Sequence, residues 1–493
     1  MLAERRTKIV ATIGPATRAR ENLENAIRAG MNVARLNFSH GAHEEHLKVI
    51  RDLRSLSIEL SAPVSILQDL QGPKIRVGKL KGGQVELVEG RDVAISTTLD
   101  LGDEKTLTTD FKELPEACKV GTRILLDDGL LELVVTQVEK TTVSCRVVYG
   151  GILKDRKGMN LPGSSLPVEC MTDKDLEDLE FGLANGVDYV ALSFVRRGSD
   201  IQKLRELIQA KSPSTKIIAK IEMLEALQNL KDIVMLSDGV MVARGDLAVE
   251  VGQTLLPQTQ KNIIALCNEM GRPVITATQM LDSMVENPRP TRAEITDVAN
   301  AVLDGTDATM LSAESASGKY PFRCIQTMHD IILEVERSSD LYYDISLERE
   351  FLDVAETIGA SASLSALKLD APVIVCLSTT GKTAMLISQF RPKAKIVAVT
   401  HVPETLNRLE LVWGIQTLLI NPYKSSEEAM EQIERKLLQY GVCKPDDKII
   451  LTLGMPVHQG AKTNTMRVFT VGRATGEKIK NADLPLRFQK PQN

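Results

Sequence analysis

Aromatic side chains make up only 3% of the 493 residues, and the chain holds a single tryptophan, Trp413. Such a sequence offers no row of rings on which the bases of a single nucleic-acid strand could stack. Positive charge is not in excess either, because 60 lysines and arginines face 65 aspartates and glutamates, for a formal net charge of −5. We therefore expect no general role in binding nucleic acid.

Long hydrophobic runs and paired cysteines are also missing. No stretch approaches the roughly 20 apolar residues of a membrane span, and the start, MLAERRTKIVATIG, has no long apolar run and no small-residue cleavage site. The seven cysteines are dispersed without any CxxC pair, which indicates reduced thiols rather than a disulfide frame or a zinc site. These absences predict a soluble, cytoplasmic protein with no membrane partner.

Short apolar runs alternate with amphipathic helical stretches in two parts of the chain. This alternation predicts parallel βα units, and eight of them predict a TIM (β/α)8 barrel. Capping-box spacings at Thr172 and Thr291 and a glycine at position 30 mark expected helix ends. The eight predicted strands are residues 8–14, 33–39, 65–70, 189–194, 216–222, 239–246, 273–279 and 308–314.

Two further segments do not follow the barrel pattern. Residues 72–168 hold β-rich runs broken by GG and DDG, which predicts an inserted small β-barrel domain that acts as a lid, with a passive insertion as the alternative. From residue 341, strands and helices alternate again and predict a separate open α/β domain. The expected division is 1–71 and 169–340 for the barrel, 72–168 for the lid and 341–493 for the C-terminal domain.

Charged residues stand at the ends of two neighbouring predicted strands. If residues 216–222 form a strand, Lys220 and Glu222 share one face. If residues 239–246 form the next, Arg244 and Asp246 share a face at its carboxyl end. Two carboxylates beside an ammonium suit Mg²⁺ or Mn²⁺ carrying a phosphorylated substrate. An ordinary buried salt bridge is the alternative.

Polar residues also gather at the expected carboxyl ends of other strands. Active sites of TIM barrels form at this face, whereas structural polar residues need not gather there. The clustering therefore favours an active site over a structural salt bridge. The residues are Arg35, Asn37, Ser39, Asp69, Thr276, Thr278, Ser312 and Glu314.

The loop STTGKTA, residues 378–384, lies between an expected strand and helix of the C-terminal domain. Its amides, its hydroxyls and the helix N-terminus could hold a phosphate. A Walker A motif is excluded because it needs a glycine where the chain has Cys376. A plain turn is the alternative. A second loop, residues 454–464, could complete a site with Lys462.

A series of motifs extends through essentially the whole chain. They are KIVATIGPA, AGMNVARLNFSHG, DLQGPKIRVG, KGMNLPG, ALSFVR, AKIE, DGVMVARGDLAVE, ITATQMLDSM, NPRPTRAE, DVANAVLDGTDATMLSAESASGKYP and TNTMRV. With these motifs in this order, the chain resembles the pyruvate kinases. The resemblance implies a glycolytic enzyme that transfers the phosphoryl group of phosphoenolpyruvate to ADP, giving ATP and pyruvate. A lyase or aldolase with the same metal carboxylates, and a non-enzymatic sugar-phosphate sensor, are the alternatives.

The resemblance also implies a role for each site residue. Glu222 and Asp246 would bind the divalent ion, and Lys220 would neutralise the phosphoryl group in transfer. Arg35 would hold the phosphate, and Thr278 would help to protonate the enolate. The remaining implied residues are Gly245 and Asp246 with their amides on the substrate carboxylate, Ser312 and Glu314 as support, and Pro15, His40, Arg76 and Lys157 around the nucleotide.

Two departures from the family pattern predict differences in ligands. Where potassium-dependent members have an acidic residue and a threonine, this chain has Lys74 and Leu70. The lysine ammonium can supply the charge of the ion, so we predict that K⁺ is not required and that Asn37, Ser39 and Asp69 hold none.

The second departure concerns regulation. Residues 454–464 lack the tryptophan- and arginine-bearing form that suits a bisphosphate. We therefore expect an allosteric effector that is a sugar monophosphate or AMP, and the family usually forms a homotetramer. The expected effector loop consists of Ser378, Thr379, Thr380, Gly381, Lys382 and Thr383.

Overall fold

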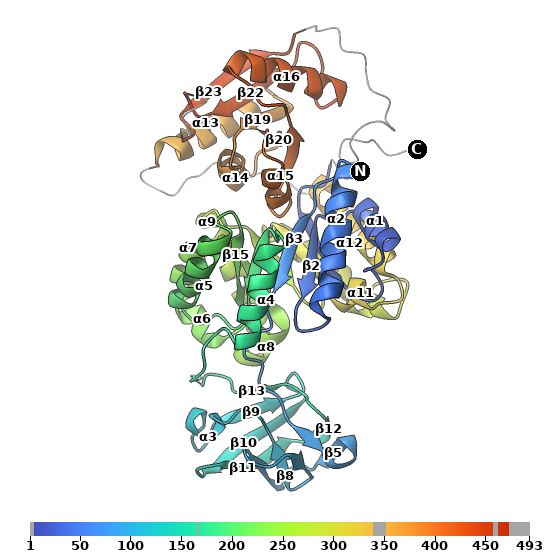
Figure 1. Ribbon diagram of the computed structural model, residues 1–493, viewed down its shortest axis with the longest axis vertical. Helices are drawn as coiled ribbons and strands as arrows, with labels where there is room; N and C mark the ends of the chain where they lie inside the picture. Colours follow the sequence, from blue (N-terminus) through green and yellow to red (C-terminus); the bar gives the residue numbers. More distant parts are fainter. Residues whose placement is uncertain (1–3, 165–166, 339–351, 457–461, 473–493) are drawn as a thin grey trace.

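The computed structural model describes residues 4–164, 167–338, 352–456 and 462–472. It shows three bodies in a row, with a β domain at one end, a barrel in the middle and an α/β domain at the other end (Figure 1). The expected boundary between residues 340 and 341 lies outside the described residues.

The central body is a closed barrel of eight parallel strands in the order β1-β18-β17-β16-β15-β14-β3-β2. This confirms the predicted TIM barrel. The strands are β1 (Lys8–Ile13), β2 (Val33–Asn37), β3 (Ser65–Asp69), β14 (Tyr189–Leu192), β15 (Lys216–Ile221), β16 (Gly239–Ala243), β17 (Val274–Ala277) and β18 (Ala308–Leu311).

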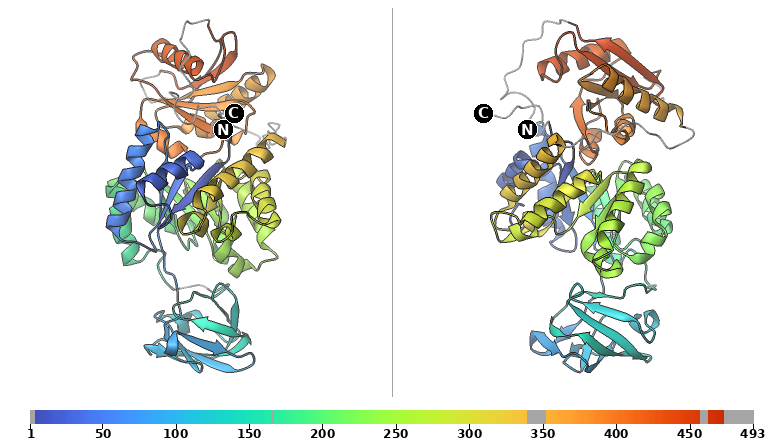
Figure 2. Two further views of the ribbon diagram at one scale, coloured as in Figure 1. Left: turned by 90° about the vertical axis from the view of Figure 1, so that its right-hand side faces the viewer. Right: turned by 180° about the vertical axis from the view of Figure 1, so that it is seen from behind.

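The barrel strands read as nearly continuous apolar runs because both of their faces are buried. Side chains such as Val10, Ile218 and Met241 fill the interior. Alternate residues pack outward against the ring of helices seen in Figure 2. The barrel helices are α1 (Arg20–Ala29), α2 (His43–Glu59), α4 (Asp173–Ala184), α5 (Gly198–Lys211), α6 (Leu224–Gln228), α7 (Leu230–Leu236), α8 (Arg244–Val251), α9 (Leu256–Glu269), η2 (Asp282–Val285), α10 (Arg292–Leu303), α11 (Ala313–Ala316) and α12 (Pro321–Ser338).

The predicted helix ends are present. Thr172 and Thr291 both accept a hydrogen bond from the amide three residues on, and the acidic side chain at that position accepts one from the backbone amide of the cap residue. Gly30 closes α1 with a φ of 119°, a conformation that favours glycine.

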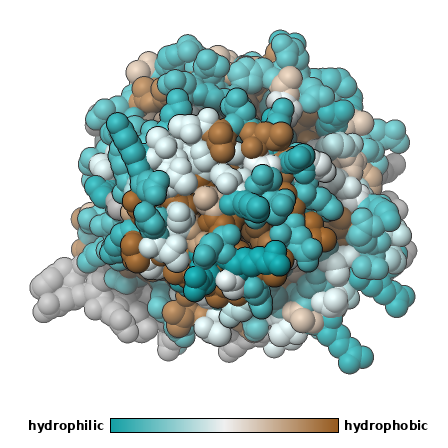
Figure 3. Space-filling view, turned by 90° about the horizontal axis from the view of Figure 1, so that it is seen from below, coloured by the Kyte–Doolittle hydropathy of each residue, from teal (hydrophilic) through white to brown (hydrophobic). Residues whose placement is uncertain are grey.

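The inserted domain lies between β3 and β14 and is joined to the barrel by two connecting segments (Figure 2). Its strands form a six-stranded sheet with two smaller two-stranded pieces, curled around one apolar core. Its outer face, viewed in Figure 3, is mostly hydrophilic with scattered apolar side chains. The elements are β4 (Lys79–Leu80), η1 (Lys81–Gly83), β5 (Gln84–Leu87), β6 (Asp92–Ser96), β7 (Leu101–Gly102), β8 (Thr106–Thr108), α3 (Leu114–Ala117), β9 (Arg123–Leu126), β10 (Leu131–Val138), β11 (Thr142–Tyr149), β12 (Gly151–Lys154) and β13 (Met159–Asn160).

The C-terminal domain is an open sheet in the order β21-β20-β19-β22-β23, with helices on both faces. Only β23 runs antiparallel. The elements are α13 (Val354–Lys368), β19 (Val373–Leu377), α14 (Lys382–Gln389), β20 (Lys395–Thr400), α15 (Pro403–Leu409), β21 (Ile415–Leu419), α16 (Ser426–Gln439), β22 (Lys448–Leu453) and β23 (Thr465–Thr470).

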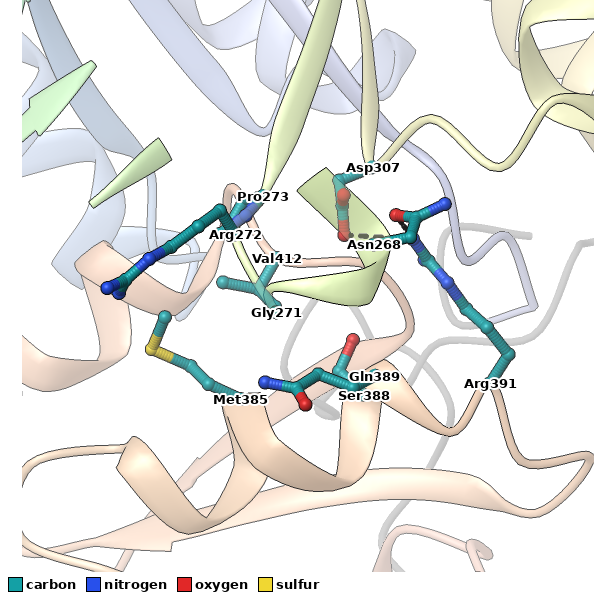
Figure 4. A pocket seen from close by; sticks show the side chains of 10 residues that line it. All are labelled: Asn268, Gly271, Arg272, Pro273, Asp307, Met385, Ser388, Gln389, Arg391 and Val412. Atoms are coloured by element: carbon teal, nitrogen blue, oxygen red, sulfur yellow. Dashed lines mark hydrogen bonds and ion pairs between the residues drawn. The ribbon is translucent and has the colours of Figure 1, made fainter. Parts of the chain in front are cut away.

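A buried cluster fastens the C-terminal domain to the base of the barrel. The Arg391 guanidinium lies 3.4 Å from Asp307 Oδ1 and 3.1 Å from Asn268 Oδ1, as Figure 4 shows. It also stacks on Trp413, whose ring carries Arg6 as a second cation. The two domains are therefore joined by charged and aromatic contacts, of which Arg391 and Trp413 are buried.

No helix in the described ranges is both long enough and apolar enough to cross a membrane.

Candidate active site

Lys220 and Glu222 meet at the carboxyl end of β15, as the alternation of the strand predicted. Lys220 Nζ lies 3.0 Å from Glu222 Oε1, and it donates a 2.6 Å hydrogen bond to Ser193 Oγ. Glu222 Oε2 accepts a 2.7 Å hydrogen bond from the amide of Phe194. Two strand ends thus fix the lysine and the carboxylate.

Asp69 at the end of β3 joins Lys220 to Arg35. Its Oδ1 lies 3.2 Å from Lys220 Nζ, and its Oδ2 lies 2.6 Å from Arg35 NH2. Burial alone would raise the pKa of Asp69, but the two cations outweigh burial and lower this pKa. Burial would likewise lower the pKa of Lys220, yet Asp69 and Glu222 raise it. Both groups are therefore charged at neutral pH.

Asp246 approaches the same place from a helix. We expected a strand through residue 246, and this expectation is wrong, because β16 ends at Ala243 and α8 begins at Arg244. The turn sends Arg244 away from Asp246 and toward β17, where its guanidinium donates to the carbonyl oxygens of Ala277 and Thr278. Asp246 remains near Glu222, as the electrostatics of that group show.

The pKa of Glu222 is raised, first by burial and then by the negative charge of Asp246. Two neighbouring carboxylates, Glu222 and Asp246, form a set of hard oxygen donors suited to a divalent cation such as Mg²⁺ or Mn²⁺. Among the residues that the structure describes, no group of three or more His, Cys, Asp or Glu side chains is placed to hold a metal ion. The residues present thus fit a cation that takes its other ligands from substrate and water.

Thr278 follows β17 with a φ of +67°, which is uncommon for a β-branched residue. Its hydroxyl accepts a 2.9 Å hydrogen bond from the amide of Gly245 and donates to the carbonyl of Ala277. Arg244 holds the Thr278 carbonyl at 2.6 Å. The structure therefore joins the Gly245 and Thr278 that the resemblance assigned to substrate binding.

Ser312 and Glu314 lie at the end of β18, where Glu314 is buried. Its carboxylate accepts hydrogen bonds from the amides of Ser312 and Leu281, at 2.7 and 3.2 Å. Burial raises the pKa of Glu314. The contacts of Glu314 shape the strand ends rather than reach Lys220.

The residues assigned to the nucleotide are spread over the barrel rim and the inserted domain. Lys157 Nζ lies 2.8 Å from Asp127 Oδ1, and Arg76 donates a 3.3 Å hydrogen bond to the carbonyl of Arg156. Pro15 and His40 are exposed on loops after β1 and β2. Within the described ranges, no hydrogen bond or ion pair joins any two of the residues Pro15, His40, Arg76 and Lys157.

The residues at the positions of the potassium site of other family members only partly lie together. Asn37 Oδ1 accepts from the amide of Ser39 at 3.1 Å, and Leu70 is buried next to Asp69. Lys74 is exposed on the connection to the inserted domain, and it lines a hollow that also contains Asp246. No ion pair is formed by Lys74 within the part of the chain that the structure describes.

The predicted effector loop, residues 378–383, leads from β19 into α14. Gly381 caps α14 with a φ of 80°, and its amide donates to Ser378 Oγ at 3.0 Å. The Thr383 hydroxyl contacts Thr463 at 2.6 Å, so the second loop does lie beside it. Lys462 is exposed. Residues 457–461 of the expected site lie outside the described residues.

Sequence reasoning missed Ser193 and Glu250. Ser193 binds Lys220, and its position at the end of the strand 189–194 could have marked it. Glu250 lines the hollow with Asp246 and accepts from the amide of Leu224 at 3.3 Å. Burial raises the pKa of Glu250 to about 7. No spacing rule indicated this contact, because it depends on how α8 leaves the barrel.

Comparison with known proteins agrees with this site. Residues 4–325 match the family model "Pyruvate kinase, barrel domain", and residues 356–469 match "Pyruvate kinase, alpha/beta domain". A pyruvate kinase of Geobacillus stearothermophilus is 43% identical over 474 residues, which cover 95% of this chain and 81% of the relative. One of Staphylococcus aureus (strain MRSA252) is 42% identical over 472 residues, with the same coverage.

Among solved structures, a pyruvate kinase from Cryptosporidium parvum superimposes with a TM-score of 0.91 at 38% identity, covering 95% of this chain and 97% of that one. Fold and site thus define a barrel enzyme of the phosphotransferase class. The chain belongs to the pyruvate kinase family. This membership favours the kinase over the lyase, aldolase and sensor alternatives.

Proposed function

We propose that the chain transfers the phosphoryl group of phosphoenolpyruvate to ADP, giving ATP and pyruvate, and that it does so in the cytoplasm. In this reaction the bond between phosphorus and the enol oxygen breaks, and a bond from phosphorus to a β-phosphate oxygen of ADP forms. The enolate that remains takes a proton at its methylene carbon. The observation that carries the proposal is the Lys220 ammonium, held between Asp69 and Glu222.

In our proposal, Glu222 and Asp246 hold the divalent cation, Mg²⁺ or Mn²⁺. When bound, such a cation neutralises phosphate charge and polarises the phosphoryl oxygens. Lys220 contacts the same oxygens because Ser193 and the two carboxylates fix its amine in place. A charge held in advance where negative charge gathers lowers the barrier to transfer.

We assign Arg35 to the substrate phosphate and Thr278 to the proton delivered to the enolate. Asp69 orients the Arg35 guanidinium through two nitrogen atoms, which supports the first assignment. The amides of Gly245 and Asp246 would hold the carboxylate at the start of α8. Pro15, His40, Arg76 and Lys157 would surround ADP when the lid closes.

The proposal includes activity without K⁺, with the Lys74 ammonium in place of the ion. The position of Lys74 in the hollow that contains Asp246 supports this part. Allosteric control through residues 378–383, by a sugar monophosphate or AMP, and assembly as a homotetramer are further parts. Calorimetry that detects binding of neither effector would remove the effector assignment.

The test is pyruvate release from phosphoenolpyruvate and ADP with magnesium, measured in sodium- and potassium-free buffer and again with potassium. We expect turnover in both. Turnover only with potassium would keep the kinase and remove the role of Lys74. No turnover in either, from folded protein with effectors added, would contradict the proposed reaction.

A further inference from the structure

A cavity of about 680 Å³ lies between the base of the barrel and the C-terminal domain. The barrel contributes the end of α2 and the loops before β14 and β15, and the C-terminal domain contributes α15, β21 and α16. Its size is within the roughly 300–1,000 Å³ of small-molecule sites. It lies at the amino ends of the strands and is therefore separate from the Lys220 site. It contains no residue of the 378–383 loop either.

The cavity carries two cations from the C-terminal domain that make no direct ion pair with a carboxylate of the described residues. Arg408 donates to the carbonyl of Ser214 at 3.3 Å and to Thr405 Oγ1 at 2.9 Å. Lys436 Nζ donates to the carbonyl of Leu419 at 2.7 Å. Over the described ranges, neither side chain makes an ion pair. The cavity wall thus offers positive charge to a ligand.

Two acidic residues of the wall, Asp188 and Glu404, balance part of this charge, and Arg54 already pairs with the first of them. Asp188 Oδ2 is held by Arg54 at 2.7 Å and also accepts from the amide of Ile66. Glu404 is exposed in the first turn of α15. Burial lowers the pKa of Lys436, so its charged form lacks solvation that an anion would restore.

Apolar side chains line the same cavity. Ile58 on α2 and Leu419 at the end of β21 are 80% and 40% exposed. Large aliphatic groups left open beside a cavity gain free energy when an apolar ligand covers them. The wall therefore suits a molecule with an apolar body as well as an anionic group.

We propose that this cavity binds a small organic anion with a flat apolar body, either a carboxylate or a phosphate monoester. Lys436 and Arg408 neutralise the anionic group, and Ile58 and Leu419 cover the body. The bound molecule contacts both domains, because the wall of the cavity combines α2 of the barrel with α15 and α16 of the C-terminal domain.

Hydrogen bonds connect the wall of this cavity to two strands that carry residues of the candidate active site. The carbonyl of Arg408 accepts a 2.6 Å hydrogen bond from the Tyr189 hydroxyl at the start of β14. Asp188 and Ile66 connect the cavity wall to β3. The opposite ends of these strands lead to Ser193 and Asp69, which contact Lys220.

Titration calorimetry of the full chain tests the proposal with three probes. These are 2-naphthoate, 1-naphthyl phosphate and the neutral 2-naphthalenemethanol. We expect at least one anion to bind, and whichever binds identifies the class of anionic group. The neutral probe should bind at least tenfold more weakly, because a charge-assisted hydrogen bond is lost.

Variants locate the site. Lys436→Met should weaken binding of the anion about tenfold, since it removes one charge and keeps the chain length. Lys448→Met, at an exposed lysine of β22 in the same domain, should leave binding unchanged. Ser57→Trp should block binding by filling the cavity from α2, with the melting temperature confirming that the variant folds.

Three results would overturn the proposal. The first is no heat from either anion. The second is equal affinity for the neutral probe. The third is binding that survives both Lys436→Met and Ser57→Trp, which would place the probe elsewhere.

Discussion

Lys157 lies 2.8 Å from Asp127 within the inserted domain, so the lysine assigned to the nucleotide is already paired with a carboxylate. In the proposed function, the phosphates of ADP compete with Asp127 for this ammonium. A partly exposed pair of this kind is worth about 0.2–1 kcal/mol.

We therefore expect Asp127→Asn to lower the KM for ADP about two- to fivefold, by freeing Lys157. Steady-state kinetics over a range of ADP concentrations measures this. Asp92→Asn is the matched control, because Asp92 pairs with Arg146 on the surface of the same domain. A raised KM in Asp127→Asn alone would show that Asp127 assists the nucleotide instead.

Lys220→Met should reduce phosphoryl transfer by several orders of magnitude, because it removes the charge nearest to the transferring group. Enolisation of added pyruvate should survive, since that step is assigned to Thr278 and the metal carboxylates. Pyruvate release measures the first activity, and exchange of the methyl protons of pyruvate for deuterium measures the second. Retention of full phosphoryl transfer would remove Lys220 from the reaction.

Lys74→Glu should make activity depend on potassium. The substitution exchanges the ammonium for a carboxylate, and a monovalent cation would then have to supply the missing charge. Activity measured against potassium concentration tests this, with Lys79→Glu as a control at another exposed lysine of the same segment. Activity that stays indifferent to potassium in Lys74→Glu would contradict the substitution.

Glu250 should make stability depend on pH in the metal-free protein. Its pKa is raised to about 7 by burial, whereas the unfolded chain releases this proton near 4.5. The folded protein thus holds the proton more tightly, and this contribution to stability is complete below pH 4.5 and is lost as pH rises to 7. The loss amounts to about 3 kcal/mol at 1.36 kcal/mol per pKa unit.

Glu250→Gln cannot titrate and should not show this loss. The difference in free energy of unfolding between the variant and the unchanged protein should therefore move in favour of the variant by about 3 kcal/mol between pH 4.5 and pH 8. Urea unfolding followed by circular dichroism provides the measurement. A difference that is constant with pH would show that folding does not raise the pKa of Glu250.

Arg391→Met should loosen the contact between the barrel and the C-terminal domain. It leaves the buried Asp307 carboxylate without its cation and removes one face of the sandwich around Trp413. Breaking a buried pair costs about 3–5 kcal/mol. Fluorescence of the sole tryptophan during urea unfolding reports the change, with the exposed Arg292→Met as the control. An unchanged midpoint would show that the cluster does not hold the domains together.

The barrel was predictable from sequence because each of its strands is an apolar run between helices with recognisable caps, such as those at Thr172 and Thr291. The pair Lys220 and Glu222 was predictable for a similar reason, since side-chain alternation alone places them together. Such local rules predict the arrangement of residues within a single helix or strand.

The features that could not be predicted from the sequence depend on where strands turn into helices and on contacts between different strands or domains. The run through Asp246 has the pattern of a strand, yet the chain turns into α8 at Arg244, and the Arg244 guanidinium donates to the carbonyls of Ala277 and Thr278 at the end of β17. The partnership of Lys220 with Ser193 joins two strands and needed the closed barrel to become visible. The wall of the large cavity comes from two domains and has no signature in either.

The pairing of β3 with β14 has a consequence for the architecture as a whole. Leu67 lies opposite Tyr189 in the barrel, although the entire inserted domain separates them in sequence. The barrel closes without any strand from that domain. The inserted domain is therefore topologically independent of the barrel, since a short loop in its place would leave the hydrogen bonds between the barrel strands intact.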